Sequence, residues 1–545
     1  MIRSRLLAFA LAGLAFLAAR PVLAERPTLP VKVSGGEIVG TDDGTLKTYL
    51  GVPFAAPPVG ALRWRRPQRI VAWRGVRKTN AFSPACAQTA DWVSNPKSED
   101  CLYLNIWAPA KARNLPVIVW IHGGGMYGGT AAVPLHNGAN LAKRGAIVVT
   151  LNYRLGIFGF FALPELSAET PEHVSGNQGI LDQIAALRWV RANIAAFGGD
   201  PDRVTIMGNS AGSESVAILV ASPLAKGLFQ RAIGESGNDA MPIRPDDDRR
   251  FDNEAAAEAK GAAFAKAIGA EHLTDLRKLS VAELHKQAWL PRVHVDGHLL
   301  RADLTTIYRN HQHNDVPLLV GWTAEEGKDL VGEYVDTRES TAAKHEDQIT
   351  KMTGLPPSAA LLAAYPGTTD AEAVASLAQL TNDWWGWRME HCAALQAQYG
   401  RSKSYLYYFA HRPAAPSTPC NWGCGAGHGV DIQYMFDNLA IDPRAWTPED
   451  RQLATRLADT VIRFARTGNP AGAGSMKWPA FDGSKAISVF ALATASATVF
   501  NAASASPRSA SVRPRIALLI RRFSCASWLP GSRAANSVLM RLSAR

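Results

Sequence analysis

The sequence predicts an α/β protein in which helices flank a central, mostly parallel sheet. Three continuous apolar runs, at Leu115–Ile121, Ala146–Leu151 and Val316–Val320, are typical of strands buried on both faces. Segments such as Gly179–Phe197 carry apolar residues at helical spacing between such runs. Strands that alternate with helices pair in parallel, and this alternation gives the fold class.

Further elements are expected on both sides of these runs. Alternating apolar and polar residues around glycines and prolines predict an early meander of strands and turns over 31–80. The more polar segment 240–315 is expected to be helical and to contribute a cap over the sheet, and 340–400 is also expected to be helical. The remaining predicted elements are a strand at Ser404–Phe409, a loop rich in Pro, Gly and Cys at Pro413–Gly429, and an amphipathic helix at Glu449–Thr467.

The net charge of +11 comes from the two ends of the 545-residue chain. Of its 58 basic residues, three lie in 1–24 and nine in 483–545, and neither segment holds an acid. The remaining 46 basic residues are matched by 47 acidic residues in 25–482, so the body of the protein is nearly neutral. A nucleic-acid or anionic-membrane partner needs a basic patch on the folded body, and the composition supports neither.

Residues 1–24 are predicted to be a secretory signal peptide, so we expect a secreted or periplasmic protein. Arg3 and Arg5 precede an apolar run, Leu6–Ala19, whose 14 residues are too few to span a membrane comfortably. Small residues at Val22–Ala24 suit a cleavage site. An uncleaved anchor helix is the alternative, but we expect no stable membrane insertion.

The C-terminal end changes in character. Acidic residues stop at Asp482, and Ala, Ser and Arg dominate from about residue 490. We therefore expect 25–500 to form the folded domain and 501–545 to be a disordered basic tail, or sequence foreign to the fold, such as a shifted reading frame would produce.

The segment Gly208–Gly212 has the pattern G-x-S-x-G around Ser210. The pattern alone is weak, since a serine in a loop between glycines would also match it. Here an apolar strand, Thr205–Met207, precedes it and a helix continues over Ser215–Val220. This strand–turn–helix frame predicts a nucleophile elbow, in which a tight turn leaves no room for a β-carbon at either glycine.

The glycines of His122–Gly125 follow a predicted buried strand and admit two readings. Gly123, Gly125 and Gly128 fit the dinucleotide pattern G-x-G-x-x-G, but the next strand ends at Asn152 without the acid that such a site requires. The pair His345-Glu346 begins like a zinc motif, but Ile349 stands where the second histidine is needed. We expect no cofactor and no metal.

Several motifs occur together in one order along the chain. They are Glu99–Asn105, His122–Gly125, Asn152–Arg154, Gly208–Gly212, Glu326-Gly327 and Gly427–Asp431. With them, the chain over roughly 30–490 resembles the type-B carboxylesterase family, the cholinesterase-like branch of the α/β-hydrolases. The resemblance implies the α/β-hydrolase fold, with helical insertions as a cap. Asn209 departs from it, because many relatives have Glu there.

The resemblance selects a catalytic triad of Ser210, His428 and Glu326. A serine hydroxyl is a weak nucleophile unless a base takes its proton, and a neutral imidazole can do so near neutral pH. Glu326 would fix the histidine tautomer and stabilise the imidazolium. Glu325 is the rival acid, but the family motif places the acid directly before Gly. Ser…Glu…His is also the chain order of α/β-hydrolases.

The resemblance also implies an oxyanion hole formed by the backbone N–H groups of Gly124, Gly125 and Ala211. Trp384 and Trp387, with Trp385 between them, fall in a segment that lies near the acyl pocket in relatives. They are candidate substrate-pocket residues, and core packing of a helix is the alternative. Ser236 is implied to support the triad through a buried hydrogen bond.

Six cysteines suit an oxidising compartment. The resemblance implies a Cys86–Cys101 disulfide, whose loop of about 15 residues would contribute roughly 3 kcal/mol. It also implies a buried ion pair between Arg63 and Glu99, with two solvated charges as the alternative. Four cysteines are left without an assigned pairing, namely Cys392, Cys420, Cys424 and Cys525. A local bridge between Cys420 and Cys424 and free buried thiols both remain open.

These expectations describe a serine carboxylesterase that hydrolyses small-molecule esters through an acyl-enzyme. The alternative is a non-catalytic, cholinesterase-like adhesion domain, but such domains lose the nucleophile, and this sequence keeps all three triad residues. The sequence names neither the acyl nor the alcohol group, and it does not indicate an oligomeric state.

Overall fold

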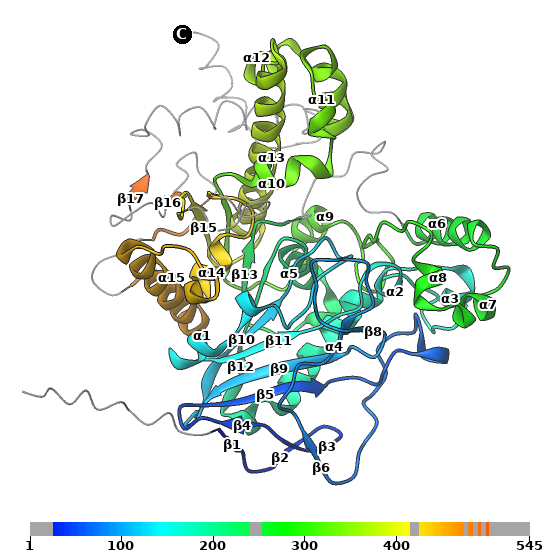
Figure 1. The fold of residues 1–545 in the computed structure, drawn as a ribbon, viewed down its shortest axis with the longest axis vertical. Coiled ribbons are helices and arrows are strands. Elements are labelled where there is room, and N and C mark those ends of the chain that lie inside the picture. Colours follow the sequence, from blue (N-terminus) through cyan, green and yellow to red (C-terminus); the bar gives the residue numbers. More distant parts are fainter. Residues whose placement is uncertain are drawn as a thin grey trace, which may run out of the picture.

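A twelve-stranded sheet runs through the part of the chain that the computed structural model describes, which is residues 25–238, 253–414, 425–472, 478–482, 489–491 and 498–500. In Figure 1 its strands lie at the centre of the molecule, with helices on both sides. The predicted signal peptide (1–24) and the predicted tail (501–545) lie outside the described residues, as do Cys420, Cys424 and Cys525.

The sheet is parallel in its middle and antiparallel at both edges. In spatial order its strands are β1 (Arg26–Pro27), β4 (Thr41–Asp42), β5 (Leu46–Pro53), β9 (Tyr103–Pro109), β11 (Ile147–Leu151), β10 (Leu115–Ile121), β12 (Gly199–Asn209), β13 (Arg231–Glu235), β14 (Leu318–Thr323), β15 (Ser404–Phe409), β16 (Val489–Ala491) and β17 (Thr498–Phe500). Neighbours from β11 to β16 in this order run parallel, and the other pairs are antiparallel. The carboxyl ends of the parallel strands share one edge, where this class of fold places ligand sites.

Two smaller sheets and the remaining helices complete the described fold. The three-stranded sheet holds β2 (Val31–Val33), β3 (Gly36–Val39) and β6 (Val76–Lys78), and the two-stranded sheet holds β7 (Ala85–Cys86) and β8 (Lys97–Ser98). The helices away from the sheet faces are α2 (Gly156–Gly159), α3 (Pro164–Ala168), α6 (Glu254–Ala267), α7 (Leu273–Lys278), α8 (Val281–Leu284), α10 (Glu326–Leu330), α11 (His345–Thr353) and α12 (Ala359–Ala364).

The central strand β10 shows why the sheet is covered on both faces. Val117, Val119 and Ile121 belong to one hydrophobic core, while Ile118 and Trp120 belong to another, and all are fully buried. Successive side chains of a strand point to opposite faces, so an all-apolar strand needs two layers of helices. The first core includes residues of α4 (Gln178–Asn193), α5 (Ala211–Ala221), α9 (Leu304–Arg309) and α13 (Asp370–Tyr399), and the second includes residues of α1 (Ala139–Lys143), α14 (Asp431–Met435) and α15 (Pro448–Thr467).

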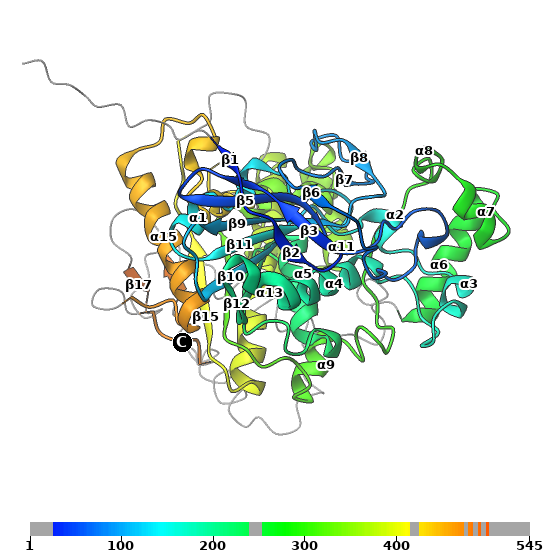
Figure 2. The ribbon, with the colours of Figure 1, turned by 90° about the horizontal axis from the view of Figure 1, so that it is seen from below.

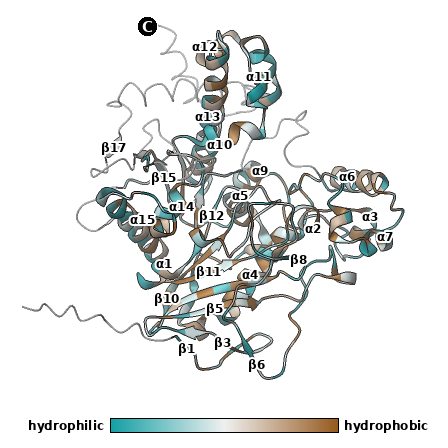
Figure 3. Ribbon diagram, in the orientation of Figure 1, coloured by the Kyte–Doolittle hydropathy of each residue, from teal (hydrophilic) through white to brown (hydrophobic). Residues whose placement is uncertain are grey.

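Helix α15 illustrates how local sequence sets the element boundaries. Thr447 and Asp450 cap its first turn reciprocally, and Gly468 ends it with φ of 72°, a left-handed conformation that favours glycine. In Figure 3, hydrophilic colour lies on α15 and α11, whereas the central strand β10 is largely hydrophobic. The apolar face of α15 closes one side of the sheet, and its polar face meets solvent.

Two groups of helices extend beyond the sheet. Helices α3, α6, α7 and α8 lie together at one side of the molecule in Figures 1 and 2 and share a small core of their own. Helices α11 and α12 pack against α13 through a second small core. Of the predicted helical segment 240–315, the described residues 253–284 form α6, α7 and α8, and α9 covers Leu304–Arg309, whereas 285–303 contain no helix.

The predicted elements that fall on described residues mostly agree with the structure in type and position, whereas 415–424 of the predicted Pro413–Gly429 loop lie outside the described residues. The strands Leu115–Ile121 and Ser404–Phe409 have the predicted bounds. The predicted helix Gly179–Phe197 is α4 followed by a 3₁₀ turn at Ile194–Phe197. The sequence predicted these elements because each one buries a continuous apolar surface, which appears as an apolar run or as apolar residues at helical spacing.

Candidate active site

Ser210 stands in a strained turn between β12 and α5. Its φ of 56° and ψ of −127° lie in a region that residues with side chains rarely adopt. A β-carbon on Gly212 would lie 2.1 Å from the carbonyl oxygen of Ile121, and one on Gly208 would lie 2.5 Å from the Gly212 backbone. Both glycines are therefore required by backbone contacts, and the turn has the geometry that the G-x-S-x-G pattern predicts.

The glycine loop after β10 lies against this turn. A β-carbon on Gly123 would approach the carbonyl oxygen of Asn209 to 2.7 Å and the β-carbon of Ser210 to 3.0 Å. Gly124 and Gly125 have φ of 106° and 60°, which favour glycine. Ala211 is the first residue of α5. The three predicted oxyanion-hole residues are thus brought to the two backbone segments that meet at Ser210.

Glu326 and His428 are joined by a short ion pair. Oε2 of Glu326 lies 2.5 Å from Nδ1 of His428, and both side chains are buried. The hydroxyl of Ser236 donates to Oε1 of Glu326 at 2.5 Å, and the Thr323 N–H donates to the same oxygen at 2.7 Å. These bonds fix the carboxylate, and the carboxylate fixes the imidazole ring.

The charges of this pair support each other. Burial tends to raise the pKa of Glu326, but the charge of His428 and the hydrogen bonds to the carboxylate outweigh it, so this pKa lies below its usual 4.5. Burial tends to lower the pKa of His428, but the carboxylates of Glu326, Asp431 and Glu333 raise it above its usual 6.5. The site therefore stabilises an imidazolium beside an ionised Glu326.

Glu325, the rival acid, serves the same loop differently. Its carboxylate bonds to Arg412 and accepts the Ala426 N–H at 2.9 Å. Asp329, on α10, accepts the backbone N–H of His428 at 2.8 Å. Acids at three positions after β14 therefore hold the histidine loop, but it is Glu326 that bonds to the imidazole ring. The sequence reading did not name Asp329, although its place one turn after Glu326 was a usable signal.

Trp385, the middle residue of the predicted pocket tryptophans on α13, contacts the ring of His428. Their ring centroids are 5.3 Å apart, and the guanidinium of Arg388 lies 4.7 Å from the Trp385 ring centroid. Trp384 and Trp387 stack on each other at 5.4 Å, and Trp384 also packs against the core under α11 and α12. The predicted pocket segment thus reaches the site, with Trp385 at its contact point.

The structural pairs expected from the resemblance are present. Cys86 and Cys101 form a disulfide. Arg63 and Glu99 form a nearly buried two-bond ion pair at 2.5 and 2.7 Å, so the alternative of solvated charges is wrong. Cys392 is a free, buried thiol.

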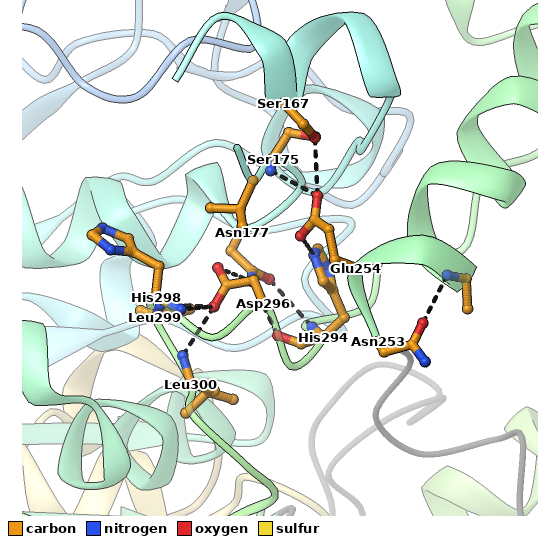
Figure 4. Close-up of polar contacts among 12 residues, drawn as sticks. Ser167, Ser175, Asn177, Asn253, Glu254, His294, Asp296, His298, Leu299 and Leu300 are labelled. Carbon is orange, nitrogen blue, oxygen red and sulfur yellow. Dashed lines mark hydrogen bonds and ion pairs between the residues drawn. The ribbon is translucent and has the colours of Figure 1, made fainter. Parts of the chain in front are cut away.

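A second cluster that contains serine, glutamate and histidine lies beside the α3–α6 group of helices (Figure 4). Glu254 accepts bonds from the Ser167 hydroxyl at 3.0 Å and the Ser175 N–H at 2.9 Å, and its other oxygen lies 2.8 Å from Nε2 of His294. The carboxylate stands between serine and histidine, so His294 has no serine hydroxyl to deprotonate in this arrangement. The cluster instead attaches the start of α6 to the loops after α3 and around Asp296.

Within the described ranges, no group of three His, Cys, Asp or Glu side chains is placed to hold a metal ion. The same ranges contain no helix with the length and apolarity needed to cross a bilayer.

Three comparisons relate this chain to known proteins. The family model described as "Carboxylesterase family" matches residues 27–506. The chain is 35% identical to a fumonisin B1 esterase from Sphingopyxis macrogoltabida over 85% of this chain and 86% of that protein. It is also 35% identical to the para-nitrobenzyl esterase of Bacillus subtilis over 82% and 91% of the two chains. A solved PNB esterase structure superposes with a TM-score of 0.73 at 32% identity and covers 89% of this chain and 99% of its own.

Proposed function

The chain belongs to the carboxylesterase family and is a carboxylic ester hydrolase, and we propose that it acts through an acyl-enzyme formed on Ser210. His428 is the general base and Glu326 the acid that orients it. The 2.5 Å contact between Glu326 and Nδ1 of His428 is the observation that carries this proposal. The histidine loop lies next to the residue before Ser210, since a β-carbon on Gly429 would lie 3.5 Å from Oδ1 of Asn209.

In the acylation step, the Ser210 oxygen attacks the ester carbonyl carbon and gives its proton to Nε2 of His428. The bond to Glu326 keeps the proton of the neutral ring on Nδ1, so Nε2 is the nitrogen that accepts. The tetrahedral intermediate collapses, the carbon–oxygen bond to the alcohol breaks, and His428 returns the proton to the departing alcohol. A water molecule then repeats the sequence on the acyl-enzyme and releases the acid.

The developing oxyanion is stabilised by backbone N–H groups. Ala211 begins α5, so its N–H carries the positive end of the helix dipole. Gly124 and Gly125 supply N–H groups from the loop after β10, where the absence of side chains lets the substrate approach. Each such donor contributes about 3–4 kcal/mol to lowering the barrier.

The substrate is a small-molecule carboxylic ester, and we assign the acyl-side wall to the segment of α13 around Trp385, whose ring contacts His428, rather than to the outer pair Trp384 and Trp387. Large aromatic surfaces favour apolar acyl groups. A panel of p-nitrophenyl esters with increasing acyl length measures this preference directly.

Labelling with an organophosphate serine probe tests the nucleophile. We expect one equivalent of probe on wild type, at Ser210 by peptide mass mapping, with complete loss of turnover. Ser210→Ala should take no label and lose several orders of magnitude of kcat. Ser222→Ala, whose hydroxyl caps the turn after α5, is the matched control and should be labelled like wild type. Ester turnover in Ser210→Ala within tenfold of wild type would reject the assignment.

The protein is also assigned to a compartment outside the cytoplasm. The Cys86–Cys101 disulfide supports an oxidising environment, and the charged start and apolar run of 1–24 support export. Cell fractionation with mass analysis of the mature N-terminus tests this, and a protein retained in the cytoplasm with Met1 intact would contradict it.

A further inference from the structure

Two buried carboxyl groups lie next to the triad without belonging to it. Glu235 is the last residue of β13, and its carbonyl oxygen accepts the Ser210 N–H at 2.9 Å. Asp431 begins α14, three residues after His428. Both side chains are completely buried. The register of β13, β14 and β15 aligns Glu235 with Gly321 and Tyr407, and the Tyr407 hydroxyl donates to Asp431. One row across the sheet therefore relates the two carboxyl groups, next to the segments that carry the nucleophile and the base.

The polar atoms of this pair are only partly satisfied. Within the described part of the chain, neither carboxyl oxygen of Glu235 has a hydrogen-bond partner, and Oδ1 of Asp431 has none either. Oδ2 of Asp431 accepts the hydroxyl of Tyr407, on β15, at 2.7 Å. A buried carboxylate without a partner costs several kcal/mol, so two ionised groups are not tolerated here.

The groups around the pair decide which carboxyl ionises. Asn209 of β12 lies opposite Glu235 in the strand register. Its side chain is a neutral amide, so it supplies no positive charge that would stabilise an ionised Glu235. Asp431 is influenced by Glu326, which disfavours its ionisation, and by His428, which favours it. Tyr407 donates to Asp431 rather than to Glu235. The hydrogen bond from Tyr407 and the positive charge of protonated His428 therefore both favour ionisation of Asp431 over ionisation of Glu235.

The titration behaviour agrees with this geometry. Burial, and then the charge of Asp431, raises the pKa of Glu235 well above 4.5. Burial raises the pKa of Asp431 to about 6, because the Tyr407 bond and His428 offset part of the cost. Near neutral pH the two groups then carry one negative charge, which lies on Asp431.

We propose that near neutral pH Glu235 is a neutral carboxylic acid, whereas Asp431 is a carboxylate that stabilises the imidazolium of His428. This rests on the proposed role of His428 as the base. Asp431 is a positioning residue, because it acts on the reaction through the histidine. Because Glu235 stays neutral, it adds no second negative charge next to Asp431.

The pH dependence of kcat/KM separates the two roles. His428 is faced by Glu326 from α10, Asp431 from α14 and Glu333 from the turn after α10, so the loss of one carboxylate leaves two. Asp431→Asn should move the acid limb of the profile to lower pH by about 0.5–1 unit. Glu235→Gln replaces a neutral acid by a neutral amide, so the acid limb of its kcat/KM profile should stay within about 0.2 pH unit of wild type. Its kcat/KM near pH 7 should also stay within about twofold of wild type. Asp202→Asn, at an exposed site, controls for net charge and should shift nothing.

Infrared difference spectra provide a readout that does not depend on turnover. The C=O band of a protonated carboxyl group should be present in wild type and Asp431→Asn near pH 7, and absent in Glu235→Gln.

Absence of this band from wild type would show that Glu235 is ionised and would overturn the proposal. A shift of the acid limb in Glu235→Gln equal to that in Asp431→Asn would do the same. An unshifted limb in Asp431→Asn would show that Asp431 does not act on His428. If the limb fails to respond to Glu326→Gln as well, the assignment of His428 as base is at fault instead.

Discussion

Glu325 and Glu326 are adjacent in the sequence, yet they bond to different parts of the same loop. Glu326 is fully buried on the ring of His428, while Glu325 holds the Ala426 N–H and an ion pair with Arg412. One residue along the chain thus separates a group that orients the imidazole from a group that anchors its loop.

We therefore predict that Glu326→Gln lowers kcat by at least about a thousandfold, because the amide cannot stabilise the imidazolium. Glu325→Gln should cost less than about tenfold, since Asp329 still holds the loop. Steady-state kinetics on a p-nitrophenyl ester measures both, with thermal unfolding of each variant as a check of folding. A larger loss in Glu325→Gln would transfer the orienting role to that residue.

The acid limb of the pH profile gives a second prediction. His428 must be neutral to accept a proton, and its pKa lies above 6.5 because nearby carboxylates outweigh the effect of burial. kcat/KM should therefore fall to half its plateau at a pH above 6.5 and continue to fall as the pH decreases. A profile measured between about pH 5 and pH 9 tests this. A midpoint at or below the value of an ordinary histidine would contradict it.

The sequence predicted those parts of the site that local sterics dictate. The turn at Ser210 excludes β-carbons at two defined positions, so its glycines are visible in a linear pattern. The central strands were visible because both of their faces are buried. The choice of Glu326 over Glu325 needed the family pattern, because two adjacent acids after a strand look alike until the loop folds over them.

Tertiary contacts account for what the sequence did not provide. Trp384, Trp385 and Trp387 spread around α13, so only the packing of the helix decides which ring meets His428. Glu235 and Asp431 lie almost 200 positions apart, and they are related only by the register that aligns Glu235 with Tyr407, whose hydroxyl donates to Asp431. The available signal for Glu235 was an acid directly after the short apolar stretch Ala232-Ile233-Gly234, because acids are rarely fully buried.

The turn glycines give a stability prediction. A β-carbon on Gly212 would meet the Ile121 carbonyl at 2.1 Å, and neither backbone can move without displacing Ser210. Gly212→Ala should lower the free energy of unfolding by about 1–3 kcal/mol or more and abolish most turnover. Gly332→Ala is the control, since nothing lies within 4 Å of its β-carbon, and it should change stability by less than about 0.5 kcal/mol. Urea unfolding compares the two, and equal effects would refute the steric argument.

A buried ion pair gives a fourth prediction. Nε and Nη2 of Arg154 each lie 2.7 Å from an oxygen of Asp182, with the side chains 3% and 0% exposed. Asp182→Ala would leave a buried guanidinium uncompensated and should cost about 3–5 kcal/mol. The exposed pair of Asp202 with Arg191 is the comparison, and Asp202→Ala should cost less than about 1 kcal/mol. A loss below about 1 kcal/mol for Asp182→Ala in urea unfolding would show that water reaches the arginine.

The last prediction separates the tryptophans of α13. Trp385 is 4% exposed and lies between His428 and Arg388, so it contacts both the base and a neighbouring charge. Trp385→Phe should lower kcat by about tenfold with little change in KM, because the smaller ring no longer supports the imidazole. Trp384→Phe, within the stack on Trp387 and the core under α11, should leave kcat within about twofold and lower stability by about 1 kcal/mol.

Kinetics on p-nitrophenyl esters of increasing acyl length distinguish support of the histidine from lining of a pocket. A residue that lines the acyl pocket changes the order of preference among chain lengths, whereas a residue that supports His428 slows all esters alike. A changed order in Trp384→Phe or Trp387→Phe, with Trp385→Phe unaltered, would place the acyl pocket at the outer pair and remove Trp385 from the active-site wall.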